Sequence, residues 1–467
     1  MIHPPVSVSR MLTIVLTMLT LSPACLHAEL PPNFVIILCD DLGYGDIGPY
    51  KSAEVRTPHL DRLAHEGMSF TDFHMASSVC SPSRAALLTG RYPQRTGVYF
   101  VIDPRTESTR RGIRSDVVTL AEALGDIGYA TGCFGKWHLG HREEHLPTAR
   151  GFDRFAGIPL SNDMPVPDEL RFSEGAQLDG YTREQAYEAE PGVIPWMIQD
   201  RVTEFPVDQS QLTRRVTQAS IDFIEEHADQ PFFLYVPHPM PHVPLAVSDA
   251  FRGSSKAGLY TDVIQELDWA VGAILKKLDD LDLAERTLVI FTSDNGPWLR
   301  HGNRGGSSGP LRGGKTGPYE GGHRVPAIFR QTGVIPANTT QDELASAMDL
   351  MPTFIRMAGG EAPPDIDGRD ITPLLLDEPG ASTPHDALYI EATVRRGDWK
   401  LILHPDGRIE LFDLKNDPAE TKDLSVDRPE LVEELKALMP RDLLRPPRLP
   451  IRGQLSEKAL RLFGIEP

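Results

Sequence analysis

One segment constrains this chain more than any other: residues 79–91, which read Val-Cys-Ser-Pro-Ser-Arg-Ala-Ala-Leu-Leu-Thr-Gly-Arg. Pro82 suits the first turn of a helix, where its missing N–H needs no partner, and Gly90 suits the helix end. Cys80 then lies at the helix N-terminus, where free N–H groups and the helix dipole attract negative charge. Arg84 lies one turn further along and can hold an oxyanion. The segment therefore predicts an anion site beside a cysteine thiol.

Short apolar runs, each followed by a polar or glycine-rich turn and then a helical pattern, predict an α/β fold. The clearest runs are Phe34–Leu38, Tyr129–Phe134, Phe232–Val236 and Leu288–Thr292. The helical patterns are Pro58–Glu66, Asp116–Ile127, Gln211–Glu226, Leu259–Leu281 and Glu343–Met357. Runs this apolar are typical of strands covered on both faces, so we expect a large, mostly parallel mixed sheet between layers of helices.

The two ends of the chain differ from its middle. Residues 1–28 have the pattern of a secretory signal, with a positive Arg10, an apolar Met11–Leu21 and a cleavage site at Ala28. The apolar run is too short for a stable membrane span, so we expect a periplasmic or secreted protein. A catalytic domain over 29–376 would then precede a small C-terminal α+β subdomain and tail over 377–467.

Within that subdomain the sequence predicts short antiparallel strands at Tyr389–Thr393, Trp399–His404 and Ile409–Asp413, and a helix at Pro429–Leu438. Residues 161–208 mix proline, glycine and charge without periodicity, which predicts an irregular insertion near the site.

Charge and cysteine content exclude some classes of protein. A formal net charge of −19 argues against nucleic acid as a partner. Cys25 leaves with the signal, and Cys39 and Cys133 lie in apolar, strand-like runs, so we expect buried thiols and no disulfide scaffold.

Carboxylates follow two of the predicted strands directly. Asp40 and Asp41 follow Phe34–Leu38 and Cys39, and Asp294 and Asn295 follow the strand that ends near Thr292. Either pair alone is more often a turn or a helix cap. Because sites form beyond the carboxyl ends of strands in α/β sheets, the four side chains are expected to converge. Adjacent carboxylates repel unless a cation lies between them, and oxygen ligands favour calcium or magnesium.

Basic side chains follow the remaining strands. Lys136 and His138 follow the strand that holds Cys133, and His242 lies in a proline-rich loop after Phe232–Val236. Lys315 lies in a glycine-rich stretch that lacks the spacing of a nucleotide-binding loop. Each residue alone is more simply a solvated lysine or a core histidine. Five polar clusters at predicted strand ends indicate one site.

These motifs resemble the type I sulfatases, whose signature is Cys-x-Pro-Ser-Arg followed by Leu-Thr-Gly, from Pro31 to Leu424. Gly-Lys-Trp-His-Leu-Gly (135–140), Gly-Phe-Asp (151–153), Gly157–Asp163 and Leu411–Pro418 place the likeness in the branch of arylsulfatase A and N-acetylgalactosamine-6-sulfatase. For a lone Cys-x-Pro, a buried thiol before an ordinary helix would be the simpler interpretation. The resemblance implies an alkaline-phosphatase-like fold.

The resemblance also implies the site. A maturation enzyme would oxidise Cys80 to formylglycine, the nucleophile. By this likeness calcium, or magnesium in its place, would be held by Asp40, Asp41, the modified Cys80, Asp294 and Asn295. The sulfate would be surrounded by Arg84, Lys136, His138, His242 and Lys315. His242 fits the family histidine better than His238, whose role stays open.

The predicted activity is hydrolysis of a sulfate monoester, releasing sulfate and an alcohol from a sulfated saccharide or an aryl sulfate. Two alternatives stay open: a formylglycine-dependent phosphonate or phosphodiester hydrolase, and a glycan-binding pseudoenzyme with an unmodified cysteine. Specificity is expected from the insertion, from residues 301–309 and from the C-terminal subdomain. Ser161, Asn162 and His404 are the candidate contacts to the alcohol.

Overall fold

A computed structural model describes the chain at residue 1 and over residues 30–52, 55–105 and 112–444. The predicted signal, with Cys25, lies outside the described residues apart from Met1. Within the described ranges no helix combines the length and apolar character needed to cross a bilayer.

An eleven-stranded mixed sheet forms the centre of the fold. In spatial order its strands are β12 (Thr339–Gln341), β2 (Met68–Phe70), β11 (Ala327–Arg330), β10 (Thr287–Ser293), β1 (Asn33–Cys39), β9 (Phe232–Pro237), β4 (Ala130–Lys136), β5 (Arg154–Ile158), β7 (Trp196–Ile198), β8 (Arg201–Phe205) and β6 (Phe172–Leu178). The five strands from β10 to β5 are mutually parallel. The four predicted strands are confirmed as β1, β4, β9 and β10.

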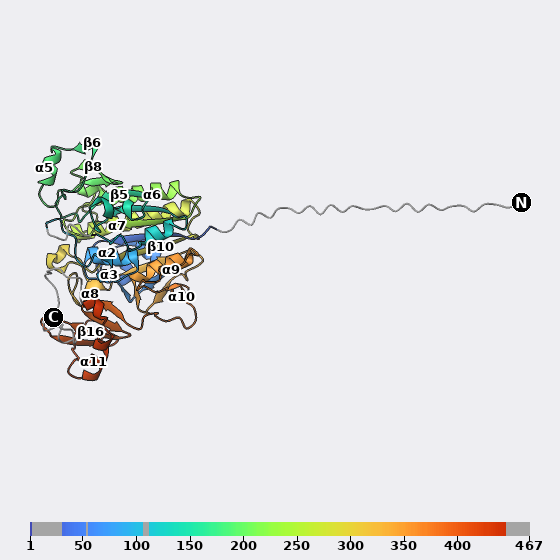
Figure 1. The fold of residues 1–467 in the computed structure, drawn as a ribbon, viewed down its shortest axis with the longest axis vertical. Coiled ribbons are helices and arrows are strands. Elements are labelled where there is room, and N and C mark those ends of the chain that lie inside the picture. Colours follow the sequence, from blue (N-terminus) through green and yellow to red (C-terminus); the bar gives the residue numbers. More distant parts are fainter. Residues whose placement is uncertain (2–29, 53–54, 106–111, 445–467) are drawn as a thin grey trace. The chain divides into compact units, whose positions relative to one another are not determined.

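Helices cover both faces of this sheet because alternate side chains of β1 point to opposite sides. Phe34 and Ile36 belong to an apolar core with α2 (Cys80–Thr89), α4 (Leu120–Gly125) and α9 (Leu350–Met357). Val35 and Ile37 belong to a second core with α1 (Pro58–His65), α6 (Leu212–Glu226) and α7 (Leu259–Asp280). Figure 1 shows α6 and α7 on one side of β10 and α2 and α9 on the other. The predicted fold class is confirmed.

Helix α2 begins at Cys80 and ends at Thr89, as its sequence predicts. Val79 precedes it in an extended conformation, with φ −143°. Gly90 adopts φ 62°, a left-handed conformation that glycine enters without strain, and its N–H bonds the carbonyl of Ala86 at 2.9 Å.

The helix predicted over Asp116–Ile127 is confined to Leu120–Gly125. Three further predictions of local structure need correction. Residues 161–208 are not wholly irregular: β6, β7 and β8 extend the main sheet, and α5 (Arg183–Tyr187) lies between them. Strand β6 is largely solvent-accessible, so its sequence carries no apolar alternation to detect. The helix predicted from Glu343 starts only at Leu350, because Ala345–Ser346 pairs as β13 with β3 (Phe73–His74).

The third correction lies in the C-terminal sheet, whose four antiparallel strands are β14 (Leu388–Ile390), β15 (Thr393–Arg396), β16 (Trp399–Leu403) and β17 (Ile409–Asp413). The strand predicted over Tyr389–Thr393 is broken at Glu391, where φ is 55°, into two strands that pair with each other. Helix α11 (Pro429–Leu438) begins and ends as predicted.

The remaining elements are short. They are α3 (Pro93–Thr96), α8 (Glu320–His323), α10 (Thr372–Leu375), α12 (Arg441–Leu444) and the 3-10 helices η1 (Gly48–Tyr50), η3 (Glu143–His145), η4 (Pro147–Arg150), η5 (Gln209–Gln211), η6 (Leu299–Arg304) and η7 (Ala347–Asp349). Cys39, Cys80 and Cys133 are buried free thiols, which confirms the prediction for Cys39 and Cys133.

A buried charged cluster joins the C-terminal sheet to the main body. Glu320 of α8 accepts from Lys400 of β16 and from Arg395 of β15, each at 3.0 Å. Arg395 also contacts Asp72 at 2.9 Å, and Asp72 lies 2.7 Å from the His74 ring. These residues, with His323, are called the anchoring cluster below: Asp72, His74, Glu320, His323, Arg395 and Lys400.

Candidate active site

The site lies where β1 and β10 end side by side. Cys39 pairs with Ser293, so Asp40 and Asp294 leave the sheet together. The backbone N–H of Asp41 donates to the Asp294 carboxylate at 3.2 Å. Asn295 donates its side-chain N–H to Asp41 at 2.7 Å. The four predicted oxygen ligands are therefore neighbours, as their positions after adjacent strands suggested.

Two oxygen atoms of this group suit a cation. Asp40 Oδ1 and Asn295 Oδ1 are buried, and within the described part of the chain neither has a hydrogen-bond partner. Burial, together with the charge of Asp40, raises the pKa of Asp294 to about 7. Buried carboxylates with unpaired oxygen atoms are the donor set of a hard divalent cation. The residues present fit the predicted metal.

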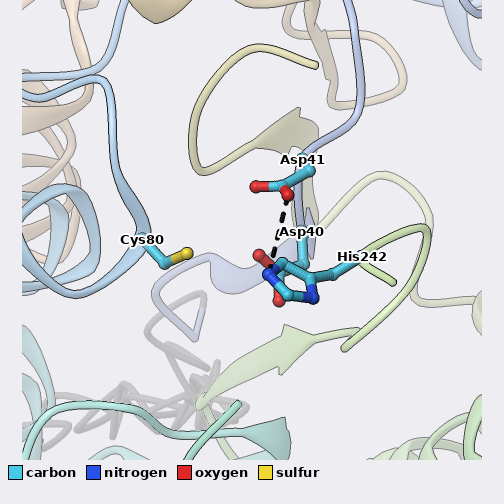
Figure 2. A group of neighbouring side chains, drawn as sticks. All are labelled: Asp40, Asp41, Cys80 and His242. Carbon is cyan, nitrogen blue, oxygen red and sulfur yellow. Dashed lines mark ion pairs between the residues drawn. The ribbon is translucent and has the colours of Figure 1, made fainter. Parts of the chain in front are cut away.

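Helix α2 directs Cys80 at these carboxylates. The thiol sulfur, Asp40, Asp41 and His242 each place one potential ligand atom within 4.8 Å of the others. Figure 2 shows the sulfur directed toward the two aspartates and the imidazole. Burial raises the pKa of the Cys80 thiol to about 12, against the opposing charges of Lys136 and Lys315. An unmodified Cys80 would therefore be a protonated, poor nucleophile at neutral pH.

Arg84 and Lys136 bind the carboxylates from inside the protein. Arg84 donates to Asp294 at 2.8 Å and to the carbonyl of Lys136 at 2.7 Å. Lys136 Nζ contacts Asp40 and donates to Ser161 Oγ at 3.0 Å. Burial alone would raise the pKa of Asp40, but Lys136, His242 and Arg84 hold that pKa well below its usual range.

His138 lies two residues after Lys136, the last residue of β4, and adopts φ 59°. Its Nε2 lies 2.9 Å from the carbonyl of Ile102. Because a carbonyl only accepts, Nε2 carries the proton and Nδ1 is left as an acceptor. Nδ1 is buried and has no hydrogen-bond partner within the described ranges. Burial, then the charges of Lys136 and Arg84, lowers the pKa of His138 well below its usual value.

Lys315 and His242 approach from the solvent side. Lys315 Nζ lies 2.7 Å from Asp41 Oδ1 and 3.3 Å from Cys80 Sγ. His242 Nε2 lies 3.7 Å from Asp41 Oδ2. The side chains of Asp41, His242 and Lys315 keep 4–6% of their area exposed, whereas those of Arg84 and Lys136 keep none. The site therefore opens on the side of Lys315 and His242.

The candidate contacts to the alcohol occupy different surroundings. Ser161 accepts from Lys136, and the buried Asn162 donates to the carbonyls of His242 and Pro244 at 3.4 and 3.2 Å. His404 lies on the C-terminal sheet, 2.5 Å from Glu410, and no contact joins it to the site residues within the described ranges. Substrate contact by these three residues stays a prediction.

His238 is separate from the chemistry as the structure shows it. Its ring is fully buried, and both ring nitrogens have no hydrogen-bond partner in the described part of the chain. Burial alone lowers its pKa to about 3. A neutral core histidine fits these facts.

Two residues at the site carried no motif in the sequence. The ring centroid of Trp298 lies 4.5 Å from Lys315 Nζ and 5.3 Å from the His242 ring. Glu391 accepts from Ser77 and Ser78, just before the Cys80 helix, at 2.8–2.9 Å. Trp298 could have been suspected from its place after Asp294-Asn295-Gly296-Pro297. Glu391 is distant in sequence, and no local signal points to it.

Known proteins match this chain along most of its length. Residues 32–360 match the Sulfatase family, and residues 315–445 match the N-sulphoglucosamine sulphohydrolase C-terminal family. Arylsulfatase A of Bos taurus is 39% identical over 463 residues, 90% of this chain and 89% of that protein. N-acetylgalactosamine-6-sulfatase of Canis lupus familiaris is 39% identical over 363 residues, 75% of this chain and 67% of that protein.

Solved structures with the same fold also match this chain along most of its length. The crystal structure of Ps i-CgsB has a TM-score of 0.78 at 28% identity, covering 93% of this chain and 98% of that one. The phosphonate monoester hydrolase of Agrobacterium radiobacter has a TM-score of 0.60 at 20% identity, over 86% of this chain and 94% of that one, and shares the fold alone.

The sheet, with carboxylates and bases converging at its carboxyl edge, defines an ester hydrolase of the alkaline-phosphatase-like fold. The chain belongs to the type I sulfatase family and hydrolyses sulfate esters.

Proposed function

We propose that this sulfatase is exported and cleaves the sulfate monoester of a sulfated saccharide, using formylglycine made from Cys80 by a maturation enzyme. The observation that carries the proposal is the position of Cys80. Its sulfur lies at the start of α2, 3.3 Å from Lys315 Nζ and beside two carboxylates. Formylglycine would supply a hydrated aldehyde whose hydroxyl attacks sulfur, avoiding the inert ester that a serine would leave.

A divalent cation, calcium or magnesium, would be held by Asp40, Asp41, Asp294 and Asn295 together with the modified residue 80. When bound, it supplies charge that stabilises the sulfuryl oxygens and the attacking oxygen. Three cationic side chains, Arg84, Lys136 and Lys315, balance three carboxylates, so the bound cation would make the pocket positive. A sulfate could then enter although the whole chain carries −19.

The chain's own groups account for the remaining steps. Arg84 and Lys136 are buried donors that orient the sulfate oxygens from inside. Lys315 or His242, on the open side, is positioned to give a proton to the departing alcohol. His138 keeps Nδ1 as an acceptor, which suits removal of a proton when sulfate is released.

A saccharide is the proposed alcohol because several relatives act on or bind one. A relative is named N-acetylgalactosamine-6-sulfatase, and a Ps i-CgsB structure is a complex with a neocarrahexaose. The polar loops around the opening of the site agree with such a substrate. Ser161, Asn162 and His404 are proposed to contact it.

The proposal is tested with one protein preparation. A mass spectrum of the peptide that contains residue 80 should show aldehyde in place of thiol, and 4-nitrophenyl sulfate should be hydrolysed far faster than phenyl phosphonate. Cys80→Ala should lose at least about a thousandfold in kcat with an unchanged thermal midpoint. Cys133→Ala, which removes a buried thiol outside the site, is the control and should keep kcat. Wild-type turnover by Cys80→Ala would overturn the mechanism.

A further inference from the structure

The segment that follows Asp294 and Asn295 is unusual in this acidic chain. Between Asn295 and Tyr319 there is no aspartate or glutamate, although the whole chain has 66 acidic residues among 467. The same stretch holds five basic residues: Arg300, His301, Arg304, Arg312 and Lys315. Lys315 lies in the site, and Arg312 donates to the carbonyl of Glu420. Within the described residues, the side chains of Arg300, His301 and Arg304 neither contact the site carboxylates nor donate to a backbone carbonyl.

The arginines of η6 have no internal counter-ion. Arg300 and Arg304 are exposed, and neither guanidinium has a hydrogen bond or an ion pair within the described residues. Elsewhere on the surface, Arg105, Arg114 and Arg154 each contact a carboxylate. The two arginines lie on either side of a kink at Gly302, and on a protein of net charge −19 no carboxylate of the described residues pairs with either. They are available to an external anion.

Trp298 lies between the segment that holds Arg300 and Arg304 and the open side of the site. Its ring lies against Lys315 Nζ at 4.5 Å and against Arg300 Cζ at 5.7 Å. The two cations are therefore no more than about 10 Å apart. His301 packs edge-on against the same ring at 4.5 Å, and its Nε2 is a buried atom without a hydrogen-bond partner in the described ranges. A disaccharide spans such a distance.

We propose that Arg300 and Arg304, carried by Trp298–Arg304, form a second anion subsite outside the catalytic pocket. This inference rests on the proposed saccharide sulfatase function and narrows its substrate class. The substrate is a saccharide that carries a second anionic group, a sulfate or a carboxylate, on a sugar next to the one that loses sulfate. The subsite binds that group without taking part in bond cleavage.

The test uses inhibition of 4-nitrophenyl sulfate hydrolysis by two probes: a short dextran sulfate oligosaccharide and glucose 6-sulfate. In the double variant Arg300→Gln/Arg304→Gln the inhibition constant of the oligosaccharide should rise about tenfold at low salt, and less at high salt. The inhibition constant of glucose 6-sulfate, and kcat and KM for 4-nitrophenyl sulfate, should stay within about twofold. Arg428→Gln removes one exposed arginine just before α11 and is the control for loss of a surface charge elsewhere on the protein.

Three results would overturn the subsite. The first is an unchanged inhibition constant of the oligosaccharide in the double variant. The second is an equal loss of affinity for the oligosaccharide, glucose 6-sulfate and 4-nitrophenyl sulfate, and the third is an equal rise of the oligosaccharide inhibition constant in Arg428→Gln; both of these indicate only general electrostatic attraction. Direct titration of the oligosaccharide by calorimetry needs no turnover. A preparation without sulfatase activity that still binds it through Arg300 and Arg304 would contradict the proposed function and leave the subsite standing.

Discussion

Two buried clusters in this protein both combine carboxylates with histidine, arginine and lysine, and they differ in how the carboxylate oxygens are paired. In the anchoring cluster each carboxylate oxygen of Glu320 contacts a cation, Lys400 or Arg395, at 3.0 Å. At the active site Asp40 Oδ1 and Asn295 Oδ1 have no hydrogen-bond partner among the described residues. We call the first cluster closed, because both Glu320 oxygens are paired with cations, and the second open, because it keeps unpaired oxygen atoms.

This difference separates a structural role from a reactive one. His74, Glu320 and His323 are close enough to resemble a metal site. Lys400 Nζ, however, lies 3.0 Å from Glu320 and 3.3 Å from the His323 ring, so positive charge already fills the space. Side chains of the anchoring cluster join segments more than 70 residues apart, as Lys400 and Glu320 do. The two clusters therefore differ in whether their carboxylate oxygens are paired, although both contain acids and bases.

Metal removal should give the largest effect and should act on the open cluster alone. Dialysis against a chelator should lower 4-nitrophenyl sulfate turnover by roughly a thousandfold, because several kcal/mol of transition-state stabilisation are lost. The thermal midpoint should also fall, since a cation that binds the folded state stabilises it. Calcium or magnesium should restore both. Full activity in protein shown by elemental analysis to be metal-free would remove the distinction between the clusters.

Breaking the closed cluster should reduce stability instead. Lys400→Met leaves the buried Glu320 with one cation fewer and should cost about 3–5 kcal/mol in the free energy of unfolding. Urea titration measures this cost. Turnover per folded molecule should remain within about threefold of wild type. Lys415→Met, which replaces an exposed lysine just after β17, should change neither quantity. A stable but inactive Lys400→Met variant would show that the anchoring cluster also positions the site.

Acid should weaken the anchoring cluster. Burial lowers the pKa of His74 against the charges of Glu320 and Asp72, and burial followed by Lys400 lowers that of His323 well below its usual value. The folded state therefore binds fewer protons than the unfolded state below the unfolded histidine pKa of about 6.5, so stability falls as pH falls. Each histidine contributes roughly 1–2 kcal/mol between pH 7 and pH 5.

The contribution of His323 to the pH dependence of stability can be separated from that of the site histidines, whose pKa values are also lowered. The urea midpoint of His323→Gln should depend less on pH than that of wild type over this range, whatever its absolute stability. His65→Gln, at an exposed position on α1, is the control and should keep the wild-type slope. An unchanged slope in His323→Gln would mean that His323 does not stay neutral in the fold.

The smallest effects are expected around the opening of the site. His404→Ala should lower kcat/KM about threefold for a sulfated oligosaccharide and leave kcat/KM for 4-nitrophenyl sulfate unchanged, since only one proposed contact to the saccharide is lost. Asn162→Ala should lower kcat/KM about fivefold for both substrates, because Asn162 also donates to the backbone carbonyl of His242 and holds its loop. Loss confined to the saccharide in Asn162→Ala would make this residue a substrate contact alone.

Local patterns predicted the centre of the protein well. Val35 and Ile37 lie within a run of apolar residues that only a strand covered on both faces can bury, and the helix from Cys80 to Thr89 has its own start and stop signals. Because polar residues follow parallel strands directly, the convergence of Asp40 with Asp294 could be predicted from strand order alone. The same reasoning failed for β6, whose exposed faces leave no pattern to detect.

Sequence by itself determined which side chains carry the chemistry, because catalytic residues follow strand and helix ends that short-range patterns define. Only the tertiary structure decided which charges are paired. Glu320 and Lys400, or Glu391 and Ser78, meet across 80 and 313 residues, and no local periodicity encodes such distances. The position of Trp298 between Lys315 and Arg300 is likewise a result of packing. Whether the oxygen atoms of a buried carboxylate are paired or unpaired depends on these long-range contacts.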